Sequence, residues 1–337
     1  MTDAAVDLNV VEPRADVPMW SETRFNGCWS PESGVGVYIH AGRFRRDLNL
    51  WWCQVVAYLP DGELCVDRLW GRNPAVAGVR LGGLDLTIAT DGWTSRLDGI
   101  GQLTSTAELA RGPRGASAPT RGMSWDLTAR PSAPVWDMYA GAPTGAFKHG
   151  DAHIQRGWHV QGTLAVGERE YAIDGVGWGD HSSGPRDMSA WSGHRFVLIV
   201  NDGWTAHIGV LDDLDDVPQQ PWGAFFREGE QHAITAFSLD PLADAFGGPV
   251  ENKLSFEVSN GERFDFQAEL IHALPMTITD ENDNINGVEW ELPGNPLVLV
   301  EGKARLTGAD GSLAYCFFER SRHRDAVPSP HAIGGTD

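Results

Sequence analysis

The chain has few basic residues for its length. It carries 26 Lys and Arg against 46 Asp and Glu in 337 residues, which gives a formal net charge of -20. A surface with this excess of negative charge repels phosphate backbones and anionic lipid headgroups. We therefore exclude nucleic acid as a partner.

Long apolar runs are also missing. A membrane-spanning helix needs roughly 20 apolar residues, whereas the run FVLIV at residues 196–200 is typical of a buried strand. The opening MTDAAVDLNVVEPRADVP has acids and prolines where a signal peptide has a basic end and an apolar core. We expect a cytoplasmic protein with a flexible leader over residues 1–17 and no integral membrane segment.

Cysteine is scarce, and its spacing gives no sign of a disulfide framework or a metal site. No CxxC pair occurs, and each cysteine sits in an apolar run, as small buried hydrophobic residues do. We expect free thiols in a reducing compartment. The four residues are Cys28, Cys53, Cys65 and Cys316.

Helical periodicity is rare, and short alternating segments joined by tight turns fill most of the chain. Residues 50–59, for example, turn at Pro60-Asp61-Gly62 into residues 64–70. This pattern predicts an all-β fold of two consecutive antiparallel barrel or sandwich domains with few short helices. The Pro- and Gly-rich passage 131–150 suggests a crossover between them. The expected boundaries are 18–149 for the first domain, 150–322 for the second and 323–337 for a flexible tail.

Tryptophan is unusually frequent, with 14 residues against 5 tyrosines. Its large apolar area and cation-binding face suit a protein that encloses a hydrophobic ligand. The same residues also suit thick sheet cores, and composition leaves both interpretations open. Trp51, Trp178 and Trp191 lie near other suggestive features, so they are candidate substrate-binding residues.

One segment, YAIDGVGWGDHSSGPRD at residues 171–187, concentrates charge at the end of a strand-like run. Asp180, His181, Arg186 and Asp187 fall within eight residues. Two neighbouring acids push their pKa values apart, and an arginine holds one of them ionised, so such a cluster can contain a proton donor. The alternative is a buried salt-bridged corner that joins two strands.

The run IDGVGWGDHSSGPRD resembles the G-x-G-x-x-DHS-x-G-x-R signature of two-domain lipocalin-like proteins related to carotenoid hydratases, tocopherol cyclases and fungal pericyclase-type cyclases. The earlier run GCWSPESGVGVYIHAGRF resembles the opening of the same family. The resemblance implies two lipocalin-like (calycin) β-barrels that bind a hydrophobic molecule and carry out cofactor-free hydration, cyclisation or isomerisation. This chain departs from the pattern at Gly179 and Ser183, where many relatives have Arg and Trp.

Acid-base chemistry on a hydrophobic alkene or allylic alcohol begins with a desolvated proton donor. We assign that role to Asp180, with the Trp178 ring facing the forming cation. Asp187, paired with Arg186, would stay ionised. His181 would relay the proton or activate water, although a neutral histidine bonded within a turn fits the sequence equally well.

A second polar set precedes the signature. His153, Gln155 and His159 share one face of an alternating strand. Pairing across the turn at Gly167 would bring them beside the signature, where they line the pocket or face water.

No complete cofactor-binding or metal-binding motif is evident in the sequence, and we expect neither a cofactor nor a metal. His149, Asp151 and His153 are a conceivable metal set, but further ligands are not evident. The acidic run at 280–291 has Ile285 where a calcium loop needs Gly. Nucleophile-elbow and dinucleotide motifs are likewise incomplete.

Two functions remain from the sequence. The first is a cofactor-independent hydratase or dehydratase (a lyase), cyclase or isomerase acting on a terpenoid, steroid-like or polyketide substrate. The second is a non-catalytic carrier of a hydrophobic small molecule. The first is favoured, mainly on the resemblance. The sequence does not give the oligomeric state.

Overall fold

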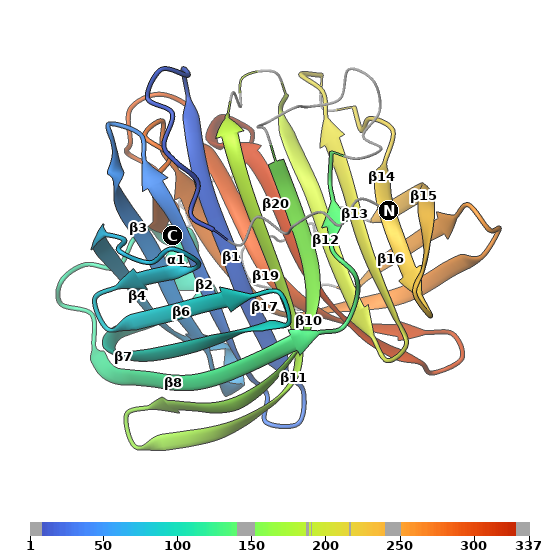
Figure 1. The fold of residues 1–337 in the computed structure, drawn as a ribbon, viewed down its shortest axis with the longest axis horizontal. Helices are drawn as coiled ribbons and strands as arrows, with labels where there is room; N and C mark the ends of the chain where they lie inside the picture. Colours follow the sequence, from blue (N-terminus) through green and yellow to red (C-terminus); the bar gives the residue numbers. More distant parts are fainter. Residues whose placement is uncertain are drawn as a thin grey trace, which may run out of the picture.

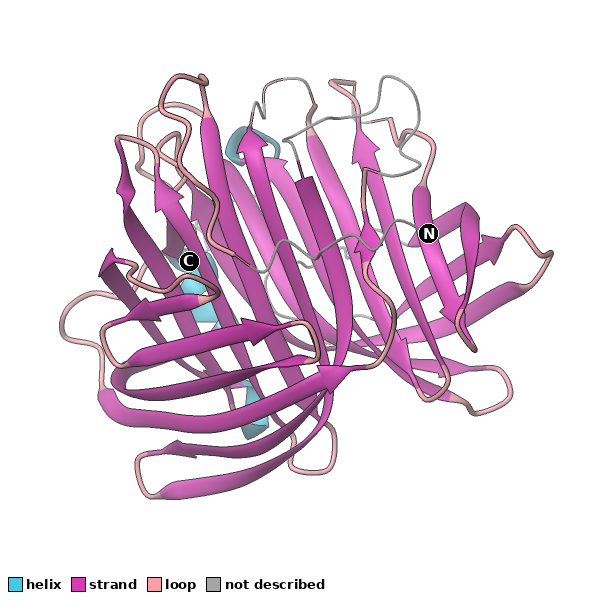
Figure 2. Ribbon diagram, viewed as in Figure 1, coloured by secondary structure: helices cyan, strands magenta, loops and turns pink. Residues whose placement is uncertain are grey.

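The computed structural model describes residues 9–139, 152–186, 189, 191–215, 217–239 and 251–327. Almost all of the regular structure in these residues is antiparallel strand, as Figure 2 shows. The prediction of an all-β fold with few short helices is confirmed. The described helical segments are η1 (Pro60–Gly62), α1 (Thr106–Arg111) and η2 (Arg324–Ala326).

The first sheet contains the strands up to residue 185. Its hydrogen-bonded order is β4-β3-β2-β1-β11-β10-β8-β7-β6-β5, β9 is attached to β10, and a further pairing of β4 with β7 closes it into a barrel. Its strands are β1 (Trp20–Ser30), β2 (Val35–Phe44), β3 (Asp47–Tyr58), β4 (Glu63–Arg72), β5 (Val79–Leu81), β6 (Leu84–Ala89), β7 (Gly92–Ser105), β8 (Thr120–Pro131), β9 (Trp136–Asp137), β10 (Ala152–Val166) and β11 (Arg169–Pro185).

The second sheet is built in the same way. Its order is β16-β15-β14-β13-β12-β20-β19-β17-β18, and a pairing of β16 with β17 closes it. Figure 1 shows the blue and cyan strands of the first sheet on the left and the yellow strands of the second on the right. The strands are β12 (Gly193–Asn201), β13 (Trp204–Asp212), β14 (Trp222–Arg227), β15 (Glu230–Leu239), β16 (Glu251–Val258), β17 (Arg263–Ile278), β18 (Asn284–Asn286), β19 (Leu297–Gly308) and β20 (Leu313–His323).

The change from one sheet to the other lies between Pro185 and Gly193, later than the predicted boundary at residue 149. The two strands responsible are β10 and β11, which pair with β8 and β1 of the first sheet. Sequence cannot show this easily, because the β1–β11 pairing joins segments that are about 150 residues apart, and pairing of that kind leaves no local pattern.

Strand β1 is buried on both faces, and this explains its place in the fold. Every residue from Trp20 to Ser30 is buried. Because side chains alternate along a strand, Cys28 packs inside the first barrel while Phe25 and Trp29 pack in the core between the two sheets.

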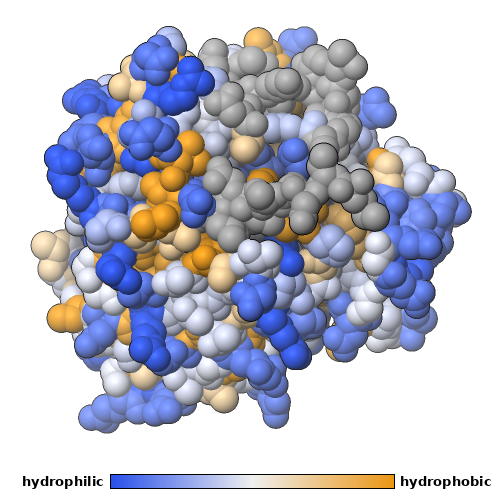
Figure 3. Space-filling view, viewed as in Figure 1, coloured by the Kyte–Doolittle hydropathy of each residue, from blue (hydrophilic) through white to orange (hydrophobic). Residues whose placement is uncertain are grey.

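The core between the sheets is aromatic. The rings of Phe25 and Phe317 stack with their centroids 4.4 Å apart, and Trp178 lies 6.3 Å from Phe317. Leu198 and Leu299 of the second sheet complete the contact. By contrast, most of the outer face shown in Figure 3 is hydrophilic, as the acidic composition requires.

Candidate functional site

A cavity lies between the two sheets, at one end of this aromatic core. It holds about 690 Å³ of empty space, including its opening to solvent. The lining residues come from both sheets and combine aromatic with ionisable side chains: Thr23, Phe25, His40, His153, Asp180, Ser182, Arg186, Trp191, His194, Phe196, Ile278, Asn282, Asn284, Leu299, Glu301 and Glu319.

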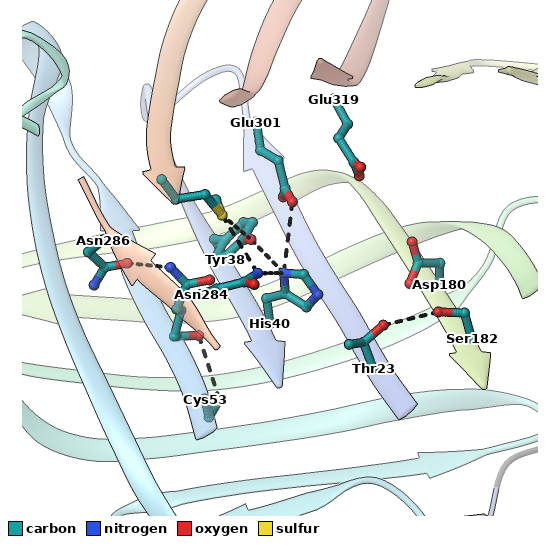
Figure 4. Close-up of polar contacts among 12 residues, drawn as sticks. Thr23, Tyr38, His40, Cys53, Asp180, Ser182, Asn284, Asn286, Glu301 and Glu319 are labelled. Atoms are coloured by element: carbon teal, nitrogen blue, oxygen red, sulfur yellow. Dashed lines mark hydrogen bonds and ion pairs between the residues drawn. The ribbon is translucent and has the colours of Figure 1, made fainter. Parts of the chain in front are cut away.

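Strand alternation brings the polar groups of the first sheet to the cavity. On β11, Asp180 and Ser182 are two residues apart and therefore share a face. Cross-strand pairing places Phe25 opposite Asp180 and Thr23 opposite Ser182, and His40 of β2 lies opposite Phe25. Figure 4 shows the Thr23, His40 and Asp180 side chains near Glu301 and Glu319 of the second sheet.

Glu301 is the most deeply buried acid of the cavity, with 1% of its surface exposed. Its Oε2 atom makes no hydrogen bond, and its Oε1 lies 3.8 Å from His40 Nδ1. Burial, followed by repulsion from Glu319 and Asp180, raises the pKa of Glu301 well above its ordinary value, despite the opposing effects of Tyr38 and Lys303. Glu301 therefore holds its proton to a higher pH than an ordinary glutamate does.

His40 beside it is neutral, because burial lowers the pKa of its imidazole to about 4. Its Nδ1 lies 2.9 Å from the Tyr38 hydroxyl and 3.3 Å from Asn284 Nδ2. An amide nitrogen can only donate, so Nδ1 is the acceptor and the imidazole proton sits on Nε2. The Asn284 amide and Tyr38 hydroxyl thus fix the tautomer of His40 (Figure 4).

Asp180 behaves differently from Glu301. His153 Nε2 lies 3.5 Å from Asp180 Oδ2. Burial alone would raise the pKa of Asp180, but His153, His40 and Arg186 outweigh that effect and lower it below the ordinary value. Asp180 is thus an ionised carboxylate at neutral pH, which argues against the predicted role of proton donor.

The remaining polar groups form two bonded sets. Arg186 donates to Thr23 Oγ1 at 2.6 Å and to Ser182 Oγ, and these two hydroxyls are 3.0 Å apart. On the second sheet, His194 bonds Glu319 through Nε2 and Ser321 through Nδ1. Arg186 and the two hydroxyls therefore line the cavity beside the first sheet, and Glu319 lines it from the second sheet.

His181, the neighbour of Asp180, points to the opposite face of β11. Its Nε2 lies 3.1 Å from Glu22 Oε1, and Glu22 also accepts from Arg43 Nε at 2.8 Å and lies 3.8 Å from Arg24. Glu22 is fully buried. Within the signature, the structure therefore separates an acid in the cavity from a buried charge cluster behind it, and His181 belongs to the cluster.

The other predicted residues are dispersed. Trp191 lines the cavity, with its ring centroid 5.0 Å from that of His194, whereas Trp178 is fully buried in the core between the sheets. Trp51 packs inside the first barrel, with Arg43 over its ring at 4.8 Å. Asp187 lies outside the described residues.

The predicted face of β10 only partly reaches the cavity. His153 lines it. Gln155 turns instead to His207, with Oε1 3.3 Å from Nδ1, and His159 pairs opposite Val176 further along the strand and is not in the lining. Of the conceivable metal set, His149 and Asp151 lie outside the described residues.

Glu301, Glu319, His40 and His194 were missed in the sequence. Glu301 had a usable signal, since it is a single acid that follows four apolar residues in LVLVE, and an acid within a buried strand is seldom placed there without a partner or a function. The histidines carried no comparable signal, because their partners lie on distant strands.

Two further properties concern only the part of the chain that the structure describes. No three or more His, Cys, Asp and Glu side chains there are placed to hold a metal ion. No helix there is long and apolar enough to cross a bilayer.

Comparison with known proteins gives a family and a fold. A family model described as "Domain of unknown function (DUF7064)" matches residues 5–324. No curated protein matches the chain. A solved structure assigned as AttH of Nitrosomonas europaea is similar, with 15% identity and a TM-score of 0.59 over 92% of this chain and 94% of that chain.

Two further structures are similar. CghA, solved with Sch210972, has 12% identity and a TM-score of 0.52 over 91% of this chain and 88% of that chain. Kievitone hydratase of Nectria haematococca has 11% identity and a TM-score of 0.45 over 95% of each chain. The AttH and CghA likenesses confirm the two-barrel lipocalin-like fold that the sequence resemblance implied.

Proposed function

Because this chain belongs to the DUF7064 family, whose description leaves the function open, we propose an activity from its cavity: an acid-base enzyme of the hydratase or cyclase type that acts on a hydrophobic small molecule. The observation that carries the proposal is the pair of opposed acids. The pKa of Glu301 is raised and that of Asp180 is lowered, within one cavity. Titratable groups with pKa values pushed apart are the arrangement that acid-base catalysis needs.

Glu301 is the proposed proton donor. Within the described residues its Oε2 has no hydrogen-bond partner, so the substrate would supply one. In the proton-transfer step, the π electrons of a substrate double bond form a new C–H bond to the Glu301 proton, and the O–H electron pair stays on Glu301 as a carboxylate. His40, neutral and held by Asn284, does not compete for that proton.

The positive charge left on the adjacent carbon would lie beside groups of the cavity that stabilise a cation. Asp180 supplies an ionised carboxylate, and Phe25, Trp191 and Phe196 supply aromatic rings that stabilise a cation by about 0.5–2 kcal/mol each. Water or a second double bond of the substrate then attacks that carbon. In hydration the proton lost from the bound water returns to Glu301. In cyclisation the new cation loses a proton from an adjacent carbon, and this proton returns to Glu301, so the enzyme is restored in both cases.

The apolar part of the lining favours a substrate with a hydrophobic body, and CghA, which shares the fold, was solved with a bound compound, Sch210972. Terpenoid, steroid-like and polyketide alkenes are the candidate classes. The Glu301 carboxyl group supplies each proton transfer in this scheme.

The test is turnover in heavy water. The purified protein is incubated in D2O with a panel of alkenes from the three classes, and the products are analysed by mass spectrometry. We expect a product with one deuterium on carbon, a loss of about 100-fold or more in Glu301→Gln, and unchanged turnover in Glu269→Gln, which alters an exposed acid on β17. Full activity of Glu301→Gln would overturn the assignment of the acid. A tightly bound compound returned without deuterium in every sample would identify a carrier instead.

A further inference from the structure

A second cavity lies on the opposite face of β11, within the first barrel. It holds about 420 Å³ of empty space, including its opening to solvent. Ile88, Val135 and Ile154 give it an apolar wall, and Trp158, Arg156 and Gly179 border the same space. Asp180 of β11 borders both this space and the cavity that contains Glu301. The lining of the second space is completed by Arg24, Asn26, Gln155 and His181.

Trp158 presents an unused hydrogen-bond donor to this cavity. The residue is 5% exposed, and its indole Nε1 has no hydrogen-bond partner. Buried donors in native proteins are nearly always bonded to protein, water or ligand. The indole N–H therefore requires an acceptor that the described chain does not supply.

Gly179 packs directly against the indole nitrogen of Trp158. A Cβ atom at this position would lie 2.7 Å from Trp158 Nε1 and 2.9 Å from the Asn26 amide. Any side chain here would therefore press on the indole nitrogen.

Arg156 adds a positive charge beside the same indole. Its guanidinium lies 5.0 Å from the centre of the Trp158 ring. Its Nε donates to the Ala133 carbonyl at 3.2 Å and its Nη1 donates to the Thr90 carbonyl at 3.0 Å. Within the described residues its polar partners are these backbone oxygens, not a carboxylate, so its charge is not neutralised by a bonded acid.

We propose that this first-barrel cavity is a second ligand site, and that it binds a compact apolar carboxylate. The hydrocarbon part packs against Ile88, Val135 and Ile154, and the carboxylate accepts hydrogen bonds from Trp158 Nε1 and from the free donors of Arg156. The proposed contacts do not use Glu301, and Asp180 borders the site without making one of them, so a failure of the proposed activity would leave this proposal standing.

Phenylacetate is a suitable probe, because it joins one ring to one carboxylate and does not fluoresce like tryptophan. The protein is labelled with nitrogen-15 at the tryptophan indoles, and the Trp158 signal is identified from Trp158→Phe. We expect phenylacetate to shift the Trp158 signal in a saturable way. The uncharged analogue phenylacetamide should bind at least tenfold more weakly, since it lacks the charge that Arg156 recognises.

Two kinds of variant sharpen the test. Arg156→Gln should weaken phenylacetate at least tenfold, and Gly179→Ala should abolish the shift by filling the space at the indole. If Gly179→Ala does not fold, Ile88→Trp blocks the cavity from the opposite wall. Glu301→Gln should bind phenylacetate as the unmodified chain does. A Trp158 signal that stays fixed at saturating phenylacetate, or equal affinity in Arg156→Gln, would overturn the proposal.

Discussion

Glu301 and Lys303 share one face of β19, two residues apart, and each is 1% exposed. The Lys303 ammonium sits 3.4 Å above the centre of the Tyr58 ring and has no hydrogen-bond partner. Attraction between the two side chains opposes their burial, yet burial dominates both. The pKa of Glu301 is raised and that of Lys303 is lowered to about 7, so burial shifts both groups toward their neutral forms.

Replacement of Glu301 by Gln should stabilise the protein, and more so as the pH rises. The unfolded Glu301 loses its proton near pH 4.5, whereas the folded one keeps it to a higher pH. Stability of the unmodified chain therefore falls with rising pH in that interval, by up to about 1.4 kcal/mol per pH unit from this group. Denaturant unfolding at pH 5, 7 and 8.5 measures the difference. A stability gap that stays constant with pH would show that Glu301 is ionised like an ordinary acid.

Lys303→Met should also stabilise the fold, with the opposite dependence on pH. Below pH 7 the folded protein must bury the charged amine, while above that pH the folded amine is neutral and the unfolded one still charged, so stability rises up to about pH 10.5. The gain from methionine should be on the order of 1–4 kcal/mol at pH 6 and smaller at pH 9. Arg305 lies on the same strand as Lys303 and forms an exposed ion pair with Glu269 of β17. Arg305→Met should therefore change stability by less than about 1 kcal/mol. Equal effects of the two variants would contradict the buried charge.

Glu22→Gln tests the cluster behind Asp180. This substitution removes the carboxylate that contacts Arg43, Arg24 and His181 in a fully buried place. Leaving buried cations without this partner costs about 3–5 kcal/mol. The pKa of Glu22 is lowered, because His181 and Arg43 outweigh burial, so the stabilisation is present above pH 4.5 and lost as the pH falls below it. A loss below 1 kcal/mol at pH 7 would show that the cluster is not stabilising.

Much of the fold follows from local sequence. The turn at 60–62 was readable because Asp61 and Gly62 adopt positive φ angles of 64° and 78°, as the Pro-Asp-Gly turn suggests. The alternation of apolar and polar residues, with tight turns between the segments, predicted the antiparallel strands of both barrels. The boundary between them was placed too early relative to the sheets, since the pairing of β11 with β1 depends on contacts that no local pattern records.

Only part of the candidate site could be predicted from the sequence. Spacing alone separates Asp180 from His181, since neighbours on a strand face opposite sides, and strict use of that rule would have assigned them to different environments. Strand alternation could not predict the protonation behaviour of Asp180 and Glu301. They depend on His153 approaching Asp180 and on the burial of Glu301 beside Glu319, which are properties of the assembled sheets.

The pH dependence of turnover should reflect the two acids in opposite directions. Because the pKa of Asp180 is lowered and that of Glu301 is raised, turnover should be level from about pH 4 through neutrality and decline at higher pH as Glu301 loses its proton. Asp180→Asn should lower the level of the plateau and leave the alkaline decline in place. An alkaline decline that keeps its position in Glu301→Gln and is lost in Asp180→Asn would instead return the donor role to Asp180.

Infrared spectroscopy of the Glu301 proton tests the central claim most directly. A protonated carboxylic acid has a C=O stretching band well separated from that of a carboxylate, so the spectrum of the unmodified chain minus that of Glu301→Gln at pH 7 isolates the state of this one residue. We predict a carboxylic acid band that is present at pH 7 and disappears as the pH is raised. A difference spectrum that shows only carboxylate bands at pH 7 would contradict the account.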